Sequence, residues 1–148
     1  MEKGEQVSDR KPRRWVKMFQ AQFVPKVQDG TKTTTIRPSS PAGNPQPGDT
    51  LDARCWTGKP YRSKQASILT AKVTRVRLVR VDEYCIRFAE PSPALEVAWS
   101  EGYGVGNPRL NEIAKADGFS GWREMAVWFE STHGLPFTGV MIEWEVAS

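Results

Sequence analysis

The sequence predicts a mixed α+β domain, a small, partly closed β-barrel of five or six strands decorated by two to four short helices. Alternating apolar and polar residues, the pattern of β-strands, occur in four segments, 15–20, 50–57, 66–84 and 138–146. Apolar residues at helical spacing occur in three segments, 21–30, 110–116 and 120–132. The alternation slips at residues 74–76, which predicts the bulge or bend by which a small barrel turns a corner.

The composition of residues 1–14 predicts a flexible basic arm, which precedes a single folded domain over residues 15–148. The arm is polar and ends in four basic residues, Arg10, Lys11, Arg13 and Arg14. Arms of this kind often contact phosphate groups. After the first predicted strand, Pro25 suits the first turn of a short helix and Gly30 suits its end.

The middle of the chain alternates between extended segments and loops. Residues 33–36 are β-branched and favour an extended conformation, and the loop at 38–49 has four prolines and two glycines in twelve residues. Residues 58–65 form a basic connection between two strands. Residues 91–108 are irregular: the pattern is compatible with a short helix at 94–99, followed by a glycine-rich loop.

The last predicted helix carries a wide apolar stripe. Ser120 is expected to cap this helix. The stripe consists of Trp122, Met125, Ala126, Trp128 and Phe129. A stripe at this spacing is typical of core packing, so we expect these side chains to pack in the core and not to bind a cofactor.

The composition excludes several classes of chemistry. Cys55 and Cys85 are too few and too far apart for a disulfide framework or a zinc ribbon. His133 is the only histidine, so neither a transition-metal centre nor a histidine-based triad is expected, and no cofactor is predicted. No apolar run approaches the roughly 20 residues that cross a bilayer, and the start lacks the apolar region of a signal peptide. We therefore expect a cytoplasmic protein without membrane contact.

The charge is distributed unevenly along the chain. Residues 1–81 contain 17 Lys or Arg and 6 Asp or Glu, whereas residues 82–148 contain 4 and 11. A concentration of positive charge is expected of a surface that binds a polyanion, because neutralising phosphates releases counterions. The alternative is an ordinary solvated surface with one basic edge.

Residues 30–37, Gly-Thr-Lys-Thr-Thr-Thr-Ile-Arg, bring candidate functional groups close together. In an extended strand alternate side chains share a face, so Thr33, Thr35 and Arg37 are expected to project together, with Lys32 at the preceding bend. The Arg37 guanidinium suits a phosphate, a carboxylate or the face of a base. The alternative is a threonine-rich edge strand with two solvated cations.

Three motifs in this order resemble the ASCH family of PUA-like domains. The first is G-x-K-x-x-E/T-x-R, matched by Gly30, Lys32, Thr35 and Arg37. The second is a P-G-D turn before a barrel strand, matched by residues 47–49. The third is a D/E-G-F helical motif, matched by residues 117–119. The likeness covers residues 15–146 and implies a PUA-like barrel whose signature segment lines a cleft.

The resemblance also implies an RNA-associated function. Some small ASCH proteins are amidohydrolases that remove the acetyl group of N4-acetylcytidine with a Lys, a Thr and an acidic residue, and others are reported as ribonucleases. Carried over to this chain, the catalytic residues are Lys32, Thr35 and Asp117, with Glu112 and Glu124 as alternative acids. A Thr hydroxyl needs an adjacent base to act as a nucleophile, and a Lys with a lowered pKa is such a base.

The basic residues around the signature favour a nucleic-acid chain over a free nucleoside. The stretch 53–81 contains eight Lys or Arg and no acid. Cations that track phosphates, interleaved with aromatic rings that stack on bases, are the predicted binding residues: Arg13, Arg14, Arg37, Arg54, Trp56, Lys59, Tyr61, Arg62 and Lys64. We therefore predict binding of RNA or another nucleic acid, with hydrolysis of a modified nucleoside or of RNA as the alternative. A third hypothesis is that the protein binds a basic protein partner through Glu124 and Glu130, which lie in the acidic second half of the chain.

Overall fold

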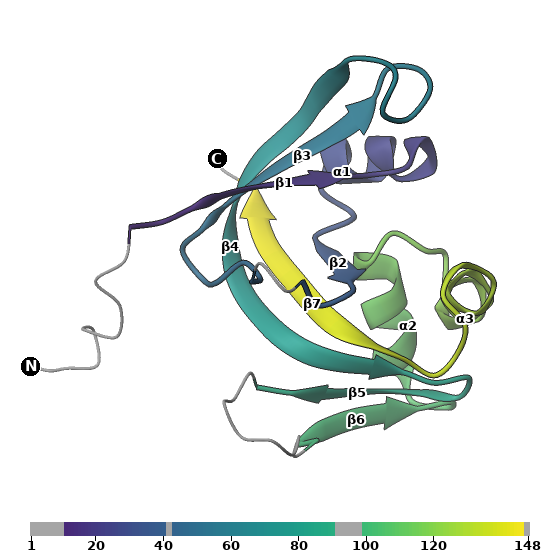
Figure 1. The fold of residues 1–148 in the computed structure, drawn as a ribbon. Helices are drawn as coiled ribbons and strands as arrows, with labels where there is room; N and C mark the ends of the chain where they lie inside the picture. Colours follow the sequence, from purple (N-terminus) through teal and green to yellow (C-terminus); the bar gives the residue numbers. More distant parts are fainter. Residues whose placement is uncertain (1–10, 41–42, 91–98, 147–148) are drawn as a thin grey trace, which may run out of the picture.

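The chain folds as a mixed α+β domain, as predicted, in which one β-sheet curves around three α-helices (Figure 1). The structure is a computed structural model and describes residues 11–40, 43–90 and 99–146. Within these ranges the sheet has seven strands, where five or six were expected.

The seven strands pair mostly antiparallel. They are β1 (Arg14–Met18), β2 (Thr34–Arg37), β3 (Thr50–Trp56), β4 (Gln65–Val81), β5 (Cys85–Ala89), β6 (Glu101–Gly104) and β7 (Phe137–Val146). The main path runs β1-β3-β4-β5-β6, and β7 pairs with both β4 and β2. The ladder between β1 and β3 is parallel. Among the described residues no ladder joins β2 to β1, so the sheet is not closed there.

The predicted bend in the long strand β4 is confirmed. The register between β4 and β7 shifts between Val73 and Arg75, and a second shift lies between Ala53 and Arg54 of β3. An extra residue in one strand bends that strand and increases its twist. β4 and β7 therefore curve around the helices instead of forming a flat layer (Figure 1).

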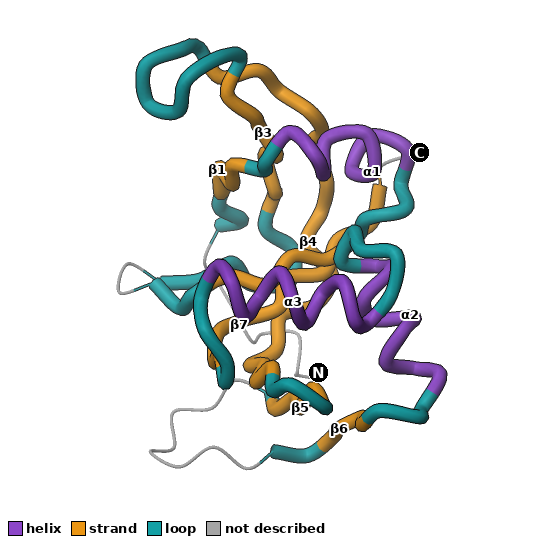
Figure 2. Tube along the Cα trace, turned by 90° about the vertical axis from the view of Figure 1, so that its right-hand side faces the viewer, coloured by secondary structure: helices purple, strands orange, loops and turns teal. Residues whose placement is uncertain are grey.

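The three helices lie on the concave side of this curved sheet (Figures 1 and 2). They are α1 (Val24–Asp29), α2 (Pro108–Ala116) and α3 (Trp122–Thr132), and a 3₁₀ turn, η2 (Ala21–Phe23), precedes α1. Gly30 ends α1 in the left-handed conformation with φ 85°, as predicted. The expected cap of α3 is wrong: Gly121 is the N-cap, and the Ser120 N–H donates to the Glu124 carboxylate at 2.6 Å.

The hydrophobic core fills the space between the sheet and the helices. The strands contribute Leu51, Val73, Val79, Ile86 and Ile142, and the helices contribute Phe23, Val27, Leu110, Met125 and Phe129, all of them buried. Burial of apolar surface stabilises the fold by about 25 cal/mol per Å². Trp122, Met125 and Phe129 confirm the predicted buried stripe of α3.

Asp49 of the P-G-D turn attaches the first strand to the sheet. Its buried carboxylate accepts hydrogen bonds from the Arg13 backbone N–H at 3.0 Å and from the Trp15 indole at 2.8 Å. Arg14 is already the first residue of β1. The predicted arm is therefore too long at its C-terminal end, and residues 1–10 lie outside the described residues.

Two strands, β5 and β6, were not predicted. The sequence of β6, Glu-Gly-Tyr-Gly, predicts part of a glycine-rich loop. A Cβ atom at Gly102 would lie 3.3 Å from the Ile86 carbonyl oxygen, so the absence of a side chain suits the close approach of β6 to β5. Pairing with a neighbour, not intrinsic propensity, makes this segment a strand. The helix predicted at 94–99 falls almost entirely outside the described residues.

Two further findings concern the cysteines and the helices. Cys55 and Cys85 are free and half-buried. None of the helices in the described ranges has the length and apolar character needed to cross a membrane.

Candidate functional site

The G-x-K-x-x-T-x-R and D-G-F motifs meet in space and hold each other. The Lys32 ammonium donates to the backbone oxygens of Thr34, at 2.7 Å, and of Asp117. The Thr34 hydroxyl donates to the Asp117 carboxylate at 3.0 Å. The Lys26 ammonium donates to the Gly118 carbonyl oxygen at 2.7 Å. The two motifs are therefore halves of one site, in which side chains of α1, of β2 and of the segment between them anchor the turn after α2.

Lys32 and Asp117 form a buried ion pair at the centre of this site. The Lys32 Nζ lies 3.5 Å from Asp117 Oδ1, and each residue is 3% exposed. Burial lowers the pKa of Lys32, and the Asp117 charge opposes that shift. Burial raises the pKa of Asp117, and the Lys32 charge opposes that shift in turn. The Lys32 amine has three oxygen acceptors around it, which match the three N–H donors of an ammonium group.

Thr35 and Arg37 share a face of β2, as predicted. The Arg37 Nε donates to the Thr35 hydroxyl at 2.9 Å, and its Nη2 donates to the Met18 carbonyl oxygen at 2.8 Å. The guanidinium carbon lies 4.7 Å from the centre of the Phe19 ring. These contacts fix the orientation of Arg37. Thr33 does not join them and borders a separate pocket.

A pocket of about 240 Å³ opens beside these polar groups and is bordered by Lys32, Thr35, Arg37 and Asp117. Its remaining walls are largely aromatic and come from the end of β1, from η2, from the turn after α2 and from α3 with the residue after it: they include Phe19, Phe23, Phe119, Trp128, Phe129 and His133. Pockets for drug-sized ligands measure about 300–1,000 Å³. This pocket therefore suits a smaller group, of the size of one planar ring system.

The structure distinguishes between the three candidate acids. Asp117 borders the pocket and contacts Lys32. Glu112 is exposed and pairs with Arg109 at 3.0 Å. Glu124 accepts a hydrogen bond from the Ser120 N–H at the start of α3. Of the three carboxylates, Asp117 is the one that lies with Lys32 and Thr35.

Sequence reasoning missed part of the pocket wall. The apolar stripe of α3 predicts Trp128 in the core alone, but this side chain is half-buried and borders the pocket together with Phe129. His133 was assigned to a helix end; it does end α3, and it also borders the pocket, where burial lowers its pKa. Residues four positions apart share a helix face, so Phe129 and His133 could have been grouped from their spacing.

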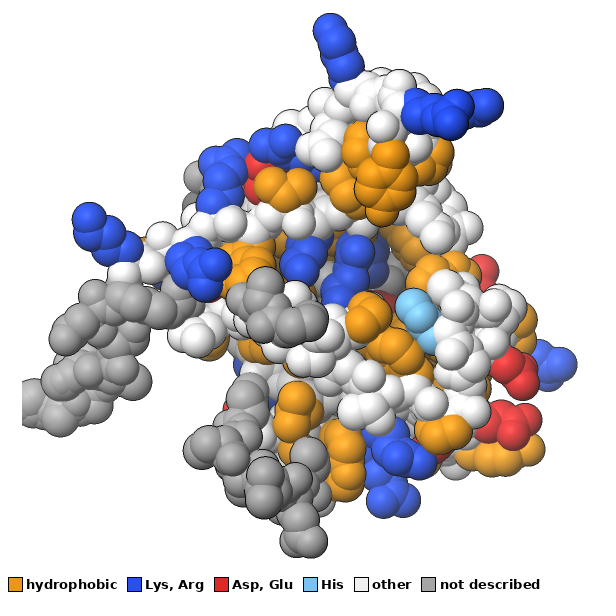
Figure 3. Space-filling view, viewed as in Figure 1, with side chains coloured by type: hydrophobic (Ala, Val, Ile, Leu, Met, Phe, Trp, Pro, Cys, Tyr) orange, Lys and Arg blue, Asp and Glu red, His pale blue; other side chains and the backbone are white. Residues whose placement is uncertain are grey.

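The β3–β4 loop, residues 57–64, presents an exposed aromatic ring among exposed cations. Tyr61 is 88% exposed and has φ 64°, which is uncommon for a bulky residue. Its ring centre lies 5.1 Å from that of Trp56. Lys and Arg side chains gather over this loop (Figure 3). Within the described ranges no ion pair involves the three cations of this loop, Lys59, Arg62 and Lys64.

Two of the predicted nucleic-acid-binding arginines are paired with a carboxylate instead. The Asp52 carboxylate lies 2.6 Å from the Arg54 guanidinium and 2.7 Å from that of Arg14. Hydrogen bonds from Arg54, followed by those from Arg14, hold the pKa of Asp52 below its usual range. Arg14 and Arg54 therefore link β1 to β3 through Asp52. Because this carboxylate offsets part of their positive charge, they should attract a polyanion less strongly.

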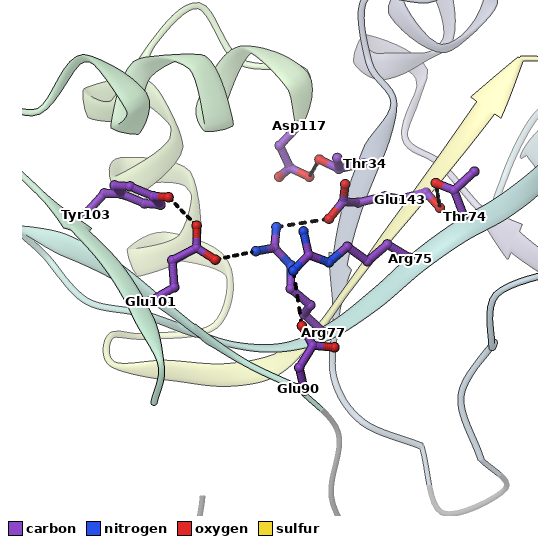
Figure 4. Close-up of polar contacts among 9 residues, drawn as sticks. All are labelled: Thr34, Thr74, Arg75, Arg77, Glu90, Glu101, Tyr103, Asp117 and Glu143. Carbon is purple, nitrogen blue, oxygen red and sulfur yellow. Dashed lines mark hydrogen bonds and ion pairs between the residues drawn. The ribbon is translucent and has the colours of Figure 1, made fainter. Parts of the chain in front are cut away.

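The arginines of β4 are paired in the same way. Arg77 is buried and contacts Glu101 and Glu143 at 3.0 Å each (Figure 4). Two more pairs are Arg75 with Glu90 at 3.1 Å and Arg80 with Asp82 at 3.3 Å. The acid-free stretch of the sequence is thus not a continuous positive surface, because acids from the second half of the chain neutralise it.

In the part of the chain that the structure describes, no group of three His, Cys, Asp or Glu side chains could hold a metal ion. Comparisons with protein-family models, with curated proteins and with solved structures found no match to this chain. Fold and site together define an α+β domain with a polar and aromatic pocket between β2 and α3 and an exposed basic loop between β3 and β4.

Proposed function

We propose that this protein is an ASCH-like, PUA-like domain that binds RNA, with one unstacked base in the pocket beside Arg37. The observation that carries this proposal is the pocket itself. Aromatic walls and fixed donors are the combination that holds a base by stacking and by hydrogen bonds to its edge. The pocket combines both kinds of group at a volume of about 240 Å³.

The β3–β4 loop supports a polymeric ligand. Bases stack on exposed aromatic rings, and cations beside them track the phosphate backbone. Tyr61 supplies the exposed ring, and Lys59, Arg62 and Lys64 supply cations without carboxylate partners in the described residues. Lys and Arg side chains also occupy a hollow below this loop on the same face of the molecule (Figure 3).

Binding to a labelled single-stranded RNA should weaken steeply as the salt concentration rises. Replacing Arg62 and Lys64 by Ala should weaken binding and lower the slope of log affinity against log salt by about 1.4, at about 0.7 per lost phosphate contact. Fluorescence anisotropy titrations at several salt concentrations measure the slope.

The matched control removes two positive charges elsewhere. Arg109→Ala with Lys115→Ala changes two exposed cations of α2 and should leave the slope within error of the unmodified protein. A flat salt response of the unmodified protein, or equal slopes for the two double variants, would contradict binding through the β3–β4 loop.

A second candidate function is hydrolysis of a modified nucleoside, N4-acetylcytidine, or of RNA. The specific observation in its favour is that Lys32, Thr35 and Asp117 border one pocket. In this mechanism the Thr35 hydroxyl attacks the acetyl carbonyl carbon of N4-acetylcytidine, and a neutral Lys32 accepts its proton. The bond from this carbon to N4 then breaks, N4 takes the proton from Lys32 so that cytidine leaves, and water hydrolyses the acetyl ester of Thr35 to release acetate. The three acceptors around the Lys32 amine favour its protonated form, so this candidate ranks below RNA binding.

Thr35→Val tests the hydrolase directly, because it removes the hydroxyl at nearly constant volume. If the mechanism operates, the unmodified protein releases cytidine from N4-acetylcytidine, and the variant loses at least about 100-fold in rate. Chromatography of the products measures both. Thr138→Val, at an exposed threonine of β7, is the control and should keep the full rate. Turnover by Thr35→Val at the unmodified rate would remove Thr35 from the mechanism.

A further inference from the structure

Lys17 of β1 directly precedes Met18, the residue whose backbone contacts Arg37 of β2 at the edge of the pocket. The Arg37 guanidinium donates to the carbonyl oxygen of Met18, the residue next to Lys17, at 2.8 Å. Met18 and Arg37 both border the pocket. Both cations are half-buried, and each lies against an aromatic ring: Lys17 against Trp15 at 5.7 Å and Arg37 against Phe19 at 4.7 Å.

Within the described residues no carboxylate contacts either of these two cations. The Lys17 ammonium makes no hydrogen bond or ion pair there, and Arg37 donates only to neutral oxygens. Burial lowers the pKa of Lys17, and the Arg37 charge lowers it further. Burial also lowers the pKa of Arg37. Asp117, the acid that acts on Arg37 from a distance, is held by Lys32 and Thr34.

Two like charges that are half-buried without a counter-ion destabilise each other until an anion binds between them. Arg37 is already oriented by Thr35 and Met18, so it offers its remaining N–H groups at little entropic cost. A phosphate has several acceptor oxygens and can contact a guanidinium fork and an ammonium point charge at once.

We propose that Lys17 and Arg37 form a phosphate site at the mouth of the pocket, and that the unit recognised is a nucleotide whose base enters the pocket and whose phosphate bridges the two cations. This inference rests on the proposed function, because it assigns the base to the same pocket. It adds a residue, Lys17, that lies outside the signature motif.

The test compares ribonucleosides with their monophosphates by isothermal titration calorimetry. The probes are the four common ribonucleosides, their 5′- and 3′-monophosphates, and inorganic phosphate. At least one monophosphate should bind roughly tenfold tighter than its nucleoside, as expected for new charge-assisted hydrogen bonds. Inorganic phosphate should bind more weakly than that monophosphate, because it leaves the pocket empty.

Lys17→Gln should reduce the preference for the monophosphate to roughly twofold or less while leaving nucleoside affinity unchanged. Lys17→Arg, which keeps the charge, should retain the preference. Lys115→Gln is the matched control at an exposed lysine of α2 and should behave like the unmodified protein. Circular dichroism melting of each variant confirms that the fold is intact.

The outcomes separate this inference from the proposed function. Equal affinities for nucleoside and monophosphate, or a preference that survives Lys17→Gln, would overturn the phosphate site and leave the base pocket standing. Absence of binding to every nucleoside, every nucleotide and RNA would overturn the proposed function as well. If RNA binds but no mononucleotide does, the test is the slope of log RNA affinity against log salt concentration. Lys17→Gln should lower this slope by about 0.7 relative to Lys115→Gln. Equal slopes for the two variants would overturn the phosphate site.

Discussion

Lys32→Met should lower the free energy of unfolding by about 3–5 kcal/mol, the usual cost of removing one partner of a buried ion pair. The reason is that the substitution leaves the Asp117 carboxylate buried beside an apolar side chain. It also removes the donor to the backbone oxygens of Thr34 and Asp117. Urea unfolding followed by tryptophan fluorescence measures the change.

Two comparisons make this prediction specific. Lys115→Met replaces an exposed lysine of α2 and should change the stability by no more than about 0.5 kcal/mol. The double variant Lys32→Met with Asp117→Asn should be less destabilised than the sum of the two single variants, because no buried charge is left unpaired. Additive effects, or a loss below about 1 kcal/mol for Lys32→Met, would show that the pair does not hold the two motifs together.

Gly118→Ala should cost about 2–4 kcal/mol and should also abolish ligand binding in the pocket. Gly118 has φ 100°, a conformation that disfavours any side chain. A Cβ atom there would lie 2.8 Å from Lys32 Cδ and 2.9 Å from Phe23 Cδ1. Both neighbours border the pocket, so their displacement changes its shape.

Gly106→Ala provides a closely matched control. Gly106 has φ 101°, but a Cβ atom there would meet nothing within 4 Å. The Gly106→Ala variant should therefore lose only about 1–2 kcal/mol of stability, from the strained backbone conformation, and should bind ligand normally. The difference between the two variants, measured by urea unfolding and by calorimetry with the tightest-binding nucleotide, isolates the steric effect. Equal losses of stability and binding would mean that the contacts of Gly118 with Lys32 and Phe23 do not matter.

Both predictions concern the same structural arrangement, in which the signature strand and the turn after α2 support each other. Lys32 and Thr34 bind Asp117, and Lys26 binds Gly118. A site held by such reciprocal contacts is oriented before a ligand arrives, which lowers the entropic cost of binding. Stability and ligand affinity should therefore change together in variants at this contact.

The local features of the site could be predicted from the sequence because they depend on neighbours in the chain. Gly30 ends α1 because only glycine adopts φ 85° without strain. Residues 34–37 form β2, in keeping with the β-branched side chains of Thr34, Thr35 and Ile36. The shared face of Thr35 and Arg37 follows from the two-residue period of a strand.

The partners of these residues could not be predicted in the same way. Asp117, Glu112 and Glu124 lie within thirteen positions of one another, and spacing alone did not select among them. The turn after α2 selects Asp117, because it brings this carboxylate into contact with Lys32, 85 residues away in the chain. The aromatic pocket wall depends likewise on the tertiary fold, which places Trp128 and Phe129 of α3 around the same pocket as Arg37 of β2.

By itself, then, the sequence determined the mixed α+β class, the bend in β4, the helix ends at glycine and the two motifs that form the site. The tertiary structure alone decided which charges remain available to a ligand. Arg77 and Glu143 are 66 residues apart, yet the pairing of β4 with β7 brings their side chains together, whereas no acid of the described residues contacts Lys17 or Arg37. Conformational preference acts over a few residues, but charge compensation depends on strands and helices that meet only in the folded chain.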